Sequence, residues 1–266
     1  MIRFHNRILH KNNKGHIGAN LLCMGFGAVM ALSIQAQAGP PQTPVPALHQ
    51  MPSELKPYAI ALGQRLQKPG KERITALGKI SYPGDTPQQA EPVRITWQYP
   101  LKMRLDRGGN SLTLDRNNPE HPALEDAKTS KTVQTLLEDS TEGLFAMQKK
   151  GVSRRFLGSG FALEGASASD PSIDIVVISY PDVFQRREPI LKSYWFNSRT
   201  KLLGVVTYTS PAGVLTHVVI DDWREVEGEM IPFRIERWEN NKLAMRLHLD
   251  SATVSAGTED SALGGD

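Results

Sequence analysis

Hydrophobic and polar residues alternate along much of the chain. Between residues 93 and 99, Val93, Ile95, Trp97 and Tyr99 occupy the odd positions and polar side chains occupy the even ones. The same alternation runs through residues 101–105 and 111–115. In a strand, successive side chains point to opposite faces, so this period of two predicts antiparallel strands with one buried face.

The alternation returns after Asp170-Pro171 and continues almost to the end of the chain. Turn signals rich in Gly, Pro and Asn separate its segments. With a preceding strand over residues 74–82, the pattern predicts about ten strands. The C-terminal ones are expected at residues 173–180, 192–197, 202–208, 214–223, 230–238 and 243–254.

Three segments have helical spacing instead. Ser53 is expected to cap a first helix, whose apolar positions are Leu55, Ala59, Leu62 and Leu66. After a loop at 116–129, a second helix is expected to start at Thr129 or Ser130. A third is expected at 141–150, capped by Asp139 or Ser140.

These elements predict a mainly β fold with helices (α+β). A run of about ten sequential antiparallel strands must curl to hide its apolar face. An open sheet leaves that face uncovered unless helices pack on it. We therefore expect a half-barrel whose concave face is covered by the central helices.

Residues 1–38 have a different pattern, which predicts a secretory signal peptide. Four basic residues and no acid precede an apolar run from Leu21 to Ile34, and Ala36-Gln37-Ala38 follows it. The apolar core is too short to span a bilayer, which takes about 20 residues. Cleavage is expected after Ala38, and the alternatives are an uncleaved anchor or lipidation at Cys23.

The rest of the chain divides by composition. Residues 39–52 are rich in proline and predict an extended linker. Residues 53–254 are expected to form a single domain, and the small, acidic segment 255–266 is expected to be a disordered tail. Export to the periplasm is the localisation that this organisation predicts.

Net charge changes once residues 1–38 are set apart. The 266-residue chain has 31 Lys and Arg against 28 Asp and Glu, a formal charge of +3. Loss of the four basic residues in the leader leaves a charge of about −1, and it also removes the only cysteine. The mature protein therefore has no basic excess to favour nucleic acid, and no thiol for a disulfide or a metal.

Catalytic motifs are weak. Ser53-Glu54-Leu55-Lys56 has the S-x-x-K spacing of penicillin-binding enzymes, but their other motifs are absent. The acidic run from Asp221 to Glu227 would suit a hydrolase only if two carboxylates faced a groove. His217 and His248 lie on polar strand faces, where a solvated pair is favoured over a metal site. We expect no enzyme activity, no metal and no cofactor.

The turns of the C-terminal half resemble those of a known superfamily. Tyr194 to Thr200 forms an aromatic strand and polar turn, and Asp222 to Gly228 with Ile231-Pro232 forms another. Both are similar to turns of the periplasmic outer-membrane lipoprotein carrier (LolA/LolB-like) superfamily, and Tyr194 to Val254 matches best. Asn197 stands where the family often has Asp. The resemblance implies a half-barrel fold, and carriers of this family hold acyl chains between sheet and helices.

An acyl-chain cavity would be lined by apolar side chains of the central strands and helices, although each of these could instead be core. We expect a soluble, non-catalytic carrier that binds a lipid or a lipoprotein acyl chain. The alternative is an envelope protein-interaction module, a sensor or assembly factor with a filled core. The expected lining residues are Trp97, Tyr99, Leu101, Met103, Leu105, Leu112, Leu114, Leu137, Leu144, Phe145 and Met147.

Overall fold

A computed structural model of the chain describes most of the segment after the predicted leader. The described residues all belong to the unit Pro40–Asp266. They are residues 51–67, 72–99, 102–115, 127–146, 153–161, 172–180, 190–210 and 212–256.

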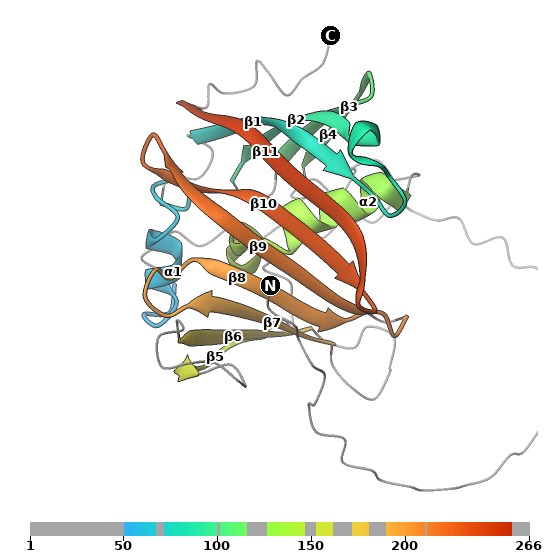
Figure 1. The fold of residues 1–266 in the computed structure, drawn as a ribbon. Coiled ribbons are helices and arrows are strands. Elements are labelled where there is room, and N and C mark those ends of the chain that lie inside the picture. Colours follow the sequence, from blue (N-terminus) through green and yellow to red (C-terminus); the bar gives the residue numbers. More distant parts are fainter. Residues whose placement is uncertain are drawn as a thin grey trace, which may run out of the picture. The chain divides into compact units, whose positions relative to one another are not determined.

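Eleven strands form one antiparallel sheet that curls without closing into a barrel (Figure 1). The sheet confirms the predicted fold class, with one strand more than expected. The strands are β1 (Glu72–Ser81), β2 (Glu91–Gln98), β3 (Lys102–Arg107), β4 (Asn110–Asp115), β5 (Ser153–Phe161), β6 (Ile173–Tyr180), β7 (Ile190–Asn197), β8 (Leu203–Thr209), β9 (Leu215–Val226), β10 (Glu229–Glu239) and β11 (Lys242–Ala256).

Strand order explains where the helices must lie. The order is β4-β3-β2-β1-β11-β10-β9-β8-β7-β6-β5, so the first and last strands of the domain pair near the middle of the sheet. The two edges are β4 and β5, which are consecutive in the chain. Their connection must travel from one edge of the sheet to the other, and Figure 1 shows its helix α2 crossing one face.

That connection contains the central helices. Helix α2 (Ala127–Val133) continues into a π-helical turn, η3 (Gln134–Glu138), and helix α3 (Thr141–Ala146) follows. The other helical elements are α1 (Lys56–Ile60) and a 3₁₀ turn, η2 (Pro87–Gln89). The name "covering segment" is used below for residues 127–146.

Most predicted strands agree with the sheet, but β5 was not predicted. Its residues Gly158 and Gly160 both have positive φ, and its pairing with β6 shifts register twice. Glycine weakens a strand and marks bulges. These glycines also interrupt the alternation that identified the other strands.

The helix predictions were only partly correct. Ser53 does not cap α1; its hydroxyl bonds to Glu54, and the α-helix is only five residues long. All four predicted apolar positions of this segment are nevertheless buried. At the third helix, Ser140 accepts a hydrogen bond from the Gly143 amide, as a cap should. Helix α2 begins two residues earlier than predicted, and residues 147–150 lie outside the described residues.

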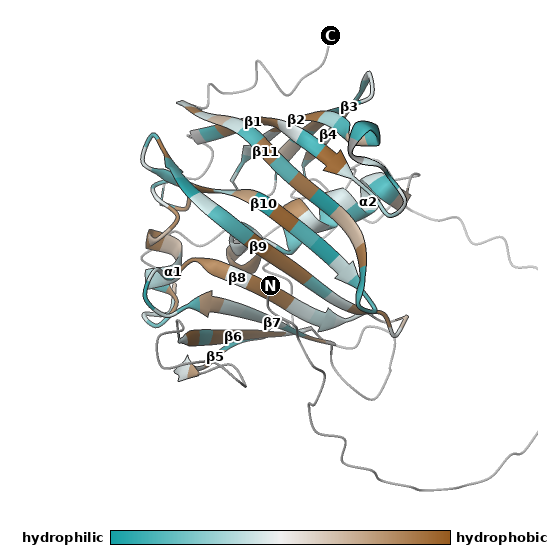
Figure 2. Ribbon diagram, viewed as in Figure 1, coloured by the Kyte–Doolittle hydropathy of each residue, from teal (hydrophilic) through white to brown (hydrophobic). Residues whose placement is uncertain are grey.

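Along the strands, buried residues alternate with less buried ones, and the buried ones form the core. Figure 2 shows the matching hydrophobic bands along the strands. Strand β10 is representative: Glu229, Ile231, Phe233, Ile235 and Arg237 are buried, and the residues between them are less so. The row therefore starts and ends with a buried charge. Both charges need partners, because an unpaired buried charge is very costly.

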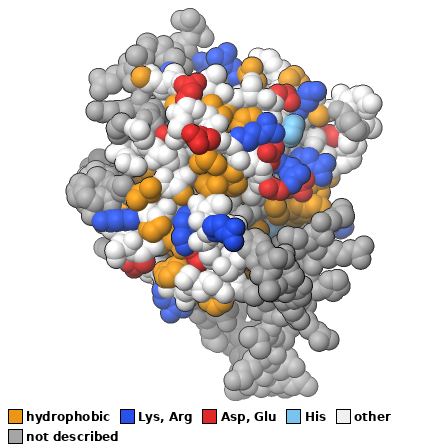
Figure 3. All heavy atoms as spheres, turned by 60° about the vertical axis from the view of Figure 1, so that its left-hand side comes forward, with side chains coloured by type: hydrophobic (Ala, Val, Ile, Leu, Met, Phe, Trp, Pro, Cys, Tyr) orange, Lys and Arg blue, Asp and Glu red, His pale blue; other side chains and the backbone are white. Residues whose placement is uncertain are grey.

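Ordered structure extends beyond both ends of the predicted domain, 53–254. Met51, in the predicted linker, is buried in the core. Ser255 and Ala256, in the predicted tail, belong to β11, and residues 257–266 lie outside the described part. Within the described part, the helices are too short or too polar to cross a membrane. On the face seen in Figure 3, basic, acidic and hydrophobic side chains are intermixed.

Candidate ligand pocket beneath the covering segment

A mainly apolar pocket lies between the sheet and the covering segment. Strands β1, β2, β3, β9 and β10 supply its sheet side, and residues 135–137 and 140–142 supply the helical side. Its lining residues are Arg65, Ile74, Trp97, Gln98, Tyr99, Lys102, Thr135, Leu136, Leu137, Ser140, Thr141, Glu142, Ile220, Trp223, Ile231, Pro232 and Ile235.

The pocket is small as it stands. Its cavity volume is about 60 Å³. An engineered cavity of roughly 150 Å³ binds benzene, and a cavity of roughly 10–15 Å³ is enough for one water. An acyl chain would therefore fit only if the covering segment moved away from the sheet.

At one end of the pocket, Arg65 joins three elements. Its Nη1 lies 2.8 Å from Glu229 Oε2, and its Nε lies 2.8 Å from Glu142 Oε1. Nη2 also donates to the carbonyl oxygen of Met230 at 2.9 Å. These bonds hold the segment after α1 against β10 and against α3. They neutralise Glu229, which starts the buried row of β10.

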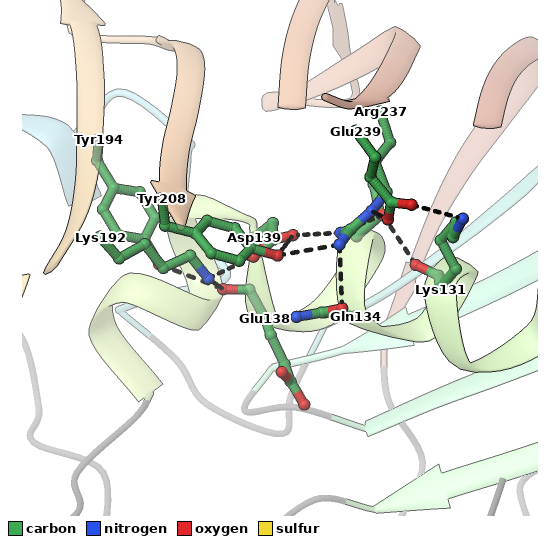
Figure 4. Close-up of polar contacts among 10 residues, drawn as sticks. Lys131, Gln134, Glu138, Asp139, Lys192, Tyr194, Tyr208, Arg237 and Glu239 are labelled. Atoms are coloured by element: carbon green, nitrogen blue, oxygen red, sulfur yellow. Dashed lines mark hydrogen bonds and ion pairs between the residues drawn. The ribbon is translucent and has the colours of Figure 1, made fainter. Parts of the chain in front are cut away.

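At the other end of that row, Asp139 lies between two cations (Figure 4). Arg237 Nη1 is 2.9 Å from Asp139 Oδ2, and Lys192 Nζ pairs with Asp139 Oδ1. The Tyr208 hydroxyl donates to Asp139 Oδ2 at 3.2 Å. The carboxylate is fully buried, so these contacts are needed to compensate its desolvation. They fasten the end of η3 to β7, β8 and β10.

Arg237 also makes hydrogen bonds to a residue of η3 and to Glu239 of its own strand. Arg237 Nη2 donates to Gln134 Oε1 at 3.2 Å, and its Nε bonds to Glu239 at 2.8 Å. Lys131 Nζ is 2.9 Å from the other Glu239 oxygen. Burial raises the pKa of Glu239, but the hydrogen bonds from Lys131 and Arg237 outweigh it and hold that pKa below its usual value. The carboxylate is therefore ionised at neutral pH.

The two tyrosines drawn in Figure 4, Tyr194 and Tyr208, keep their phenolic protons. Burial, with the negative charge of Asp139 adding to it, raises the pKa of Tyr208 to about 12. The same two causes raise the pKa of Tyr194, which is completely buried. Neither hydroxyl is a base at physiological pH, so these two tyrosines can offer hydrogen bonds but do not abstract protons.

Of the eleven predicted lining residues, Trp97, Tyr99 and Leu137 line the pocket. Six of the others are described and do not line the pocket. Leu112 is half-buried against the core, and Leu101 and Met147 lie outside the described residues. Five are core residues that do not line the pocket: Met103, Leu105, Leu114, Leu144 and Phe145.

The polar residues of the region were not predicted. Arg237 carried the clearest signal, because the alternating row Ile231, Phe233, Ile235 extends to position 237. An arginine in a buried row implies a buried acidic partner. The sequence identifies Asp139 only as a candidate helix cap, and it places Arg65 in a segment with the spacing of an amphipathic helix.

The other candidate sites are dispersed. Asp221 pairs with Arg234 and Asp222 with Arg224, and none of these residues lines the pocket. His217 and His248 do not meet, because β10 separates their strands. Among the described residues, no cluster of three or more potential metal ligands occurs.

Comparisons with known proteins give similarities of fold. No protein-family model matches the chain, and no curated protein matches it. Similar solved structures include the following three. A LolA superfamily protein from Nitrosomonas europaea has 14% identity and a TM-score of 0.38, covering 69% of this chain and 85% of its own.

A domain named for outer membrane lipoprotein sorting, from Vibrio parahaemolyticus, has 8% identity and a TM-score of 0.42, covering 74% of this chain and 90% of its own. A DUF1329 family protein from Desulfovibrio piger has 7% identity and a TM-score of 0.45, covering 78% and 95%. The chain is similar in fold to these distant proteins.

Proposed function

We propose that this protein is a soluble periplasmic protein that binds a hydrophobic ligand, either a lipid or the acyl chain of a lipoprotein, and carries it without catalysis. One observation carries the proposal: a mainly apolar pocket lies between a curled sheet and a separate helical segment. The predicted signal peptide is the basis for the periplasmic location.

Burial would supply the affinity. Each CH₂ group removed from water contributes roughly 0.8 kcal/mol. A chain of several CH₂ groups could therefore offset the separation of Leu136 and Leu137 from the sheet. These leucines line the pocket, and they belong to a π-helical turn rather than to a regular helix.

The tryptophans permit a direct test. Two of the four, Trp97 and Trp223, line the pocket, whereas Trp195 and Trp238 do not. Bromine on an acyl chain quenches tryptophan fluorescence on contact. The protein, purified from expression of the full chain and delipidated, should therefore be quenched by the methyl ester of a dibrominated stearate and not by methyl stearate.

Matched variants locate the ligand. Replacing Trp97 and Trp223 by Phe should remove most of the quenching, and replacing Trp195 and Trp238 should leave it. Native mass spectrometry after mild purification should also show bound lipid. Uptake of no acyl probe by the delipidated protein would contradict the proposal.

A second function is favoured by the size of the pocket. A volume of about 60 Å³ and the ion pairs around Asp139 also suit a filled interior. In that case the protein would be an envelope interaction module, a sensor or assembly factor. Capture of one defined periplasmic partner, with no quenching by the brominated chain, would favour this second function.

A further inference from the structure

Two buried hydroxyl groups belong to residues that line the pocket. Tyr99 follows β2 and is 4% exposed, and Thr141 begins α3 and is 2% exposed. Within the described part of the chain, neither side-chain oxygen has a hydrogen-bond partner. Buried polar groups are almost always paired, so two unpaired ones at the same pocket call for an explanation.

The charged groups of the lining are already committed to protein partners. Arg65 is neutralised by Glu229 and Glu142, both at 2.8 Å. Lys102 lies 3.4 Å from Asp115. An anionic ligand would therefore have to compete with carboxylates of the protein for Arg65 and Lys102, and it would lie close to Glu142.

The chemical state of Tyr99 makes it a donor. Burial, with the nearby charge of Glu142 adding to it, holds the pKa of this phenol well above its usual value. The proton therefore stays on the oxygen at every physiological pH. The Thr141 hydroxyl can rotate to donate as well. The pocket thus combines apolar walls with two hydroxyl donors.

From these observations we infer that the ligand is a neutral acyl ester or amide, whose carbonyl oxygen accepts hydrogen bonds from Tyr99 and Thr141. The inference rests on the proposed function and specifies its ligand. A carbonyl oxygen has two lone pairs, so it can accept from either hydroxyl or from both. A pure hydrocarbon would leave them unpaired, and a free carboxylate would lose its hydration without gaining a cation.

The test compares three competitors that displace the fluorescent probe N-phenyl-1-naphthylamine at pH 8. They are methyl laurate, the hydrocarbon tridecane and sodium laurate. Because these compounds differ in water solubility, the quantity compared is the affinity of each variant relative to wild type. Tyr99→Phe and Thr141→Val remove one hydroxyl each with little change in shape.

Each substitution should lower the affinity for methyl laurate by roughly two- to tenfold, which is the range expected for the loss of one hydrogen bond. Tridecane affinity should stay the same or rise. Thr216→Val is the matched control, because Thr216 also has a buried hydroxyl without a partner in the described residues but does not line the pocket. It should change neither affinity. Sodium laurate should bind wild type more weakly than methyl laurate.

The possible outcomes distinguish failure of this inference from failure of the proposed function. Equal losses for ester and hydrocarbon, or tighter binding of laurate than of its methyl ester, would overturn the ester assignment and leave hydrophobic binding intact. Displacement of the probe by none of the three would overturn both. Circular dichroism melting of each variant identifies any loss that comes from unfolding.

Discussion

Single residues in this domain are constrained mostly by close backbone approach and by buried charge. Gly78 lies at the bulge where β1 and β11 shift register. A Cβ added there would overlap the carbonyl oxygen of His248 and lie 2.8 Å from Leu249 Cα. Asp139 is constrained differently, by ion pairs with two cations. Both positions hold parts of the chain together that are far apart in sequence.

Gly78→Ala should lower the free energy of unfolding by about 1–3 kcal/mol, because backbone atoms must move to admit the methyl group. Urea denaturation measures this. Gly204→Ala is the control: its added Cβ would have its nearest neighbour at 3.7 Å, and its φ is not positive. We expect it to be neutral or mildly stabilising. Equal losses at both glycines would show that the close approach at β11 is not the cause.

Asp139→Ala should cost about 3–5 kcal/mol, because it removes the buried carboxylate that pairs with both Lys192 and Arg237. Asp221→Ala removes an exposed partner of Arg234 and should cost less than about 1 kcal/mol. Chemical denaturation of both variants in the same buffer gives the comparison. A loss at Asp139 no larger than that at Asp221 would mean that the buried cluster contributes little to stability.

Among the elements, α1 is short and depends on tertiary contacts. A five-residue helix is not stable by itself in water. Tyr58 donates to Asp174 on β6 at 2.8 Å, and its ring lies 4.4 Å from that of Phe196. Lys201 and Ser198 also bond to Asp174. This contact and the Arg65 contact together dock α1 and the turn after it onto the sheet.

Asp174 should make this docking sensitive to acid. Burial raises the pKa of its carboxyl, but hydrogen bonds from Lys201, Ser198 and Tyr58 outweigh that effect and lower it. The folded pKa thus lies below the unfolded value of about 3.9. The stabilisation is present above that value and is lost as pH falls through the folded pKa.

Unfolding free energies at several pH values test the sign. The advantage of wild type over Asp174→Asn should be largest near pH 7 and should shrink below about pH 4. Asp250→Asn, at an exposed position of β11, should give a much smaller change. A wild-type advantage that grows on acidification would contradict the assignment.

For the whole molecule, the order of strands decides where a ligand could go. The two edge strands are consecutive in the chain, so the covering segment has to cross the sheet between them. Ion pairs attach the covering segment to the rest of the domain near Arg65 and Asp139, and its contacts at Leu136 and Leu137 are apolar. Ligand entry would therefore move Leu136 and Leu137 away from the sheet, while the polar contacts near Arg65 and Asp139 keep the covering segment attached.

The predicted leader is testable at the same scale. Protein purified from periplasm after expression of the full chain should begin at Gly39, and intact mass spectrometry would show this. It should also contain no thiol that reacts with maleimide, because Cys23 is the only cysteine. Ala38→Arg should block processing. A mature protein that retains Cys23 with an added lipid would establish the alternative, an anchored lipoprotein.

What the sequence by itself determined is local. Strand positions, the turn at Asn197 and the fold class follow from side-chain alternation and turn chemistry, which involve near neighbours. The tertiary structure decided the pocket and its polar groups. Arg65 and Glu229 are 164 positions apart, and Arg237 and Asp139 are 98 apart. No local pattern encodes such pairings, because they depend on how the sheet curls and where the covering segment crosses it.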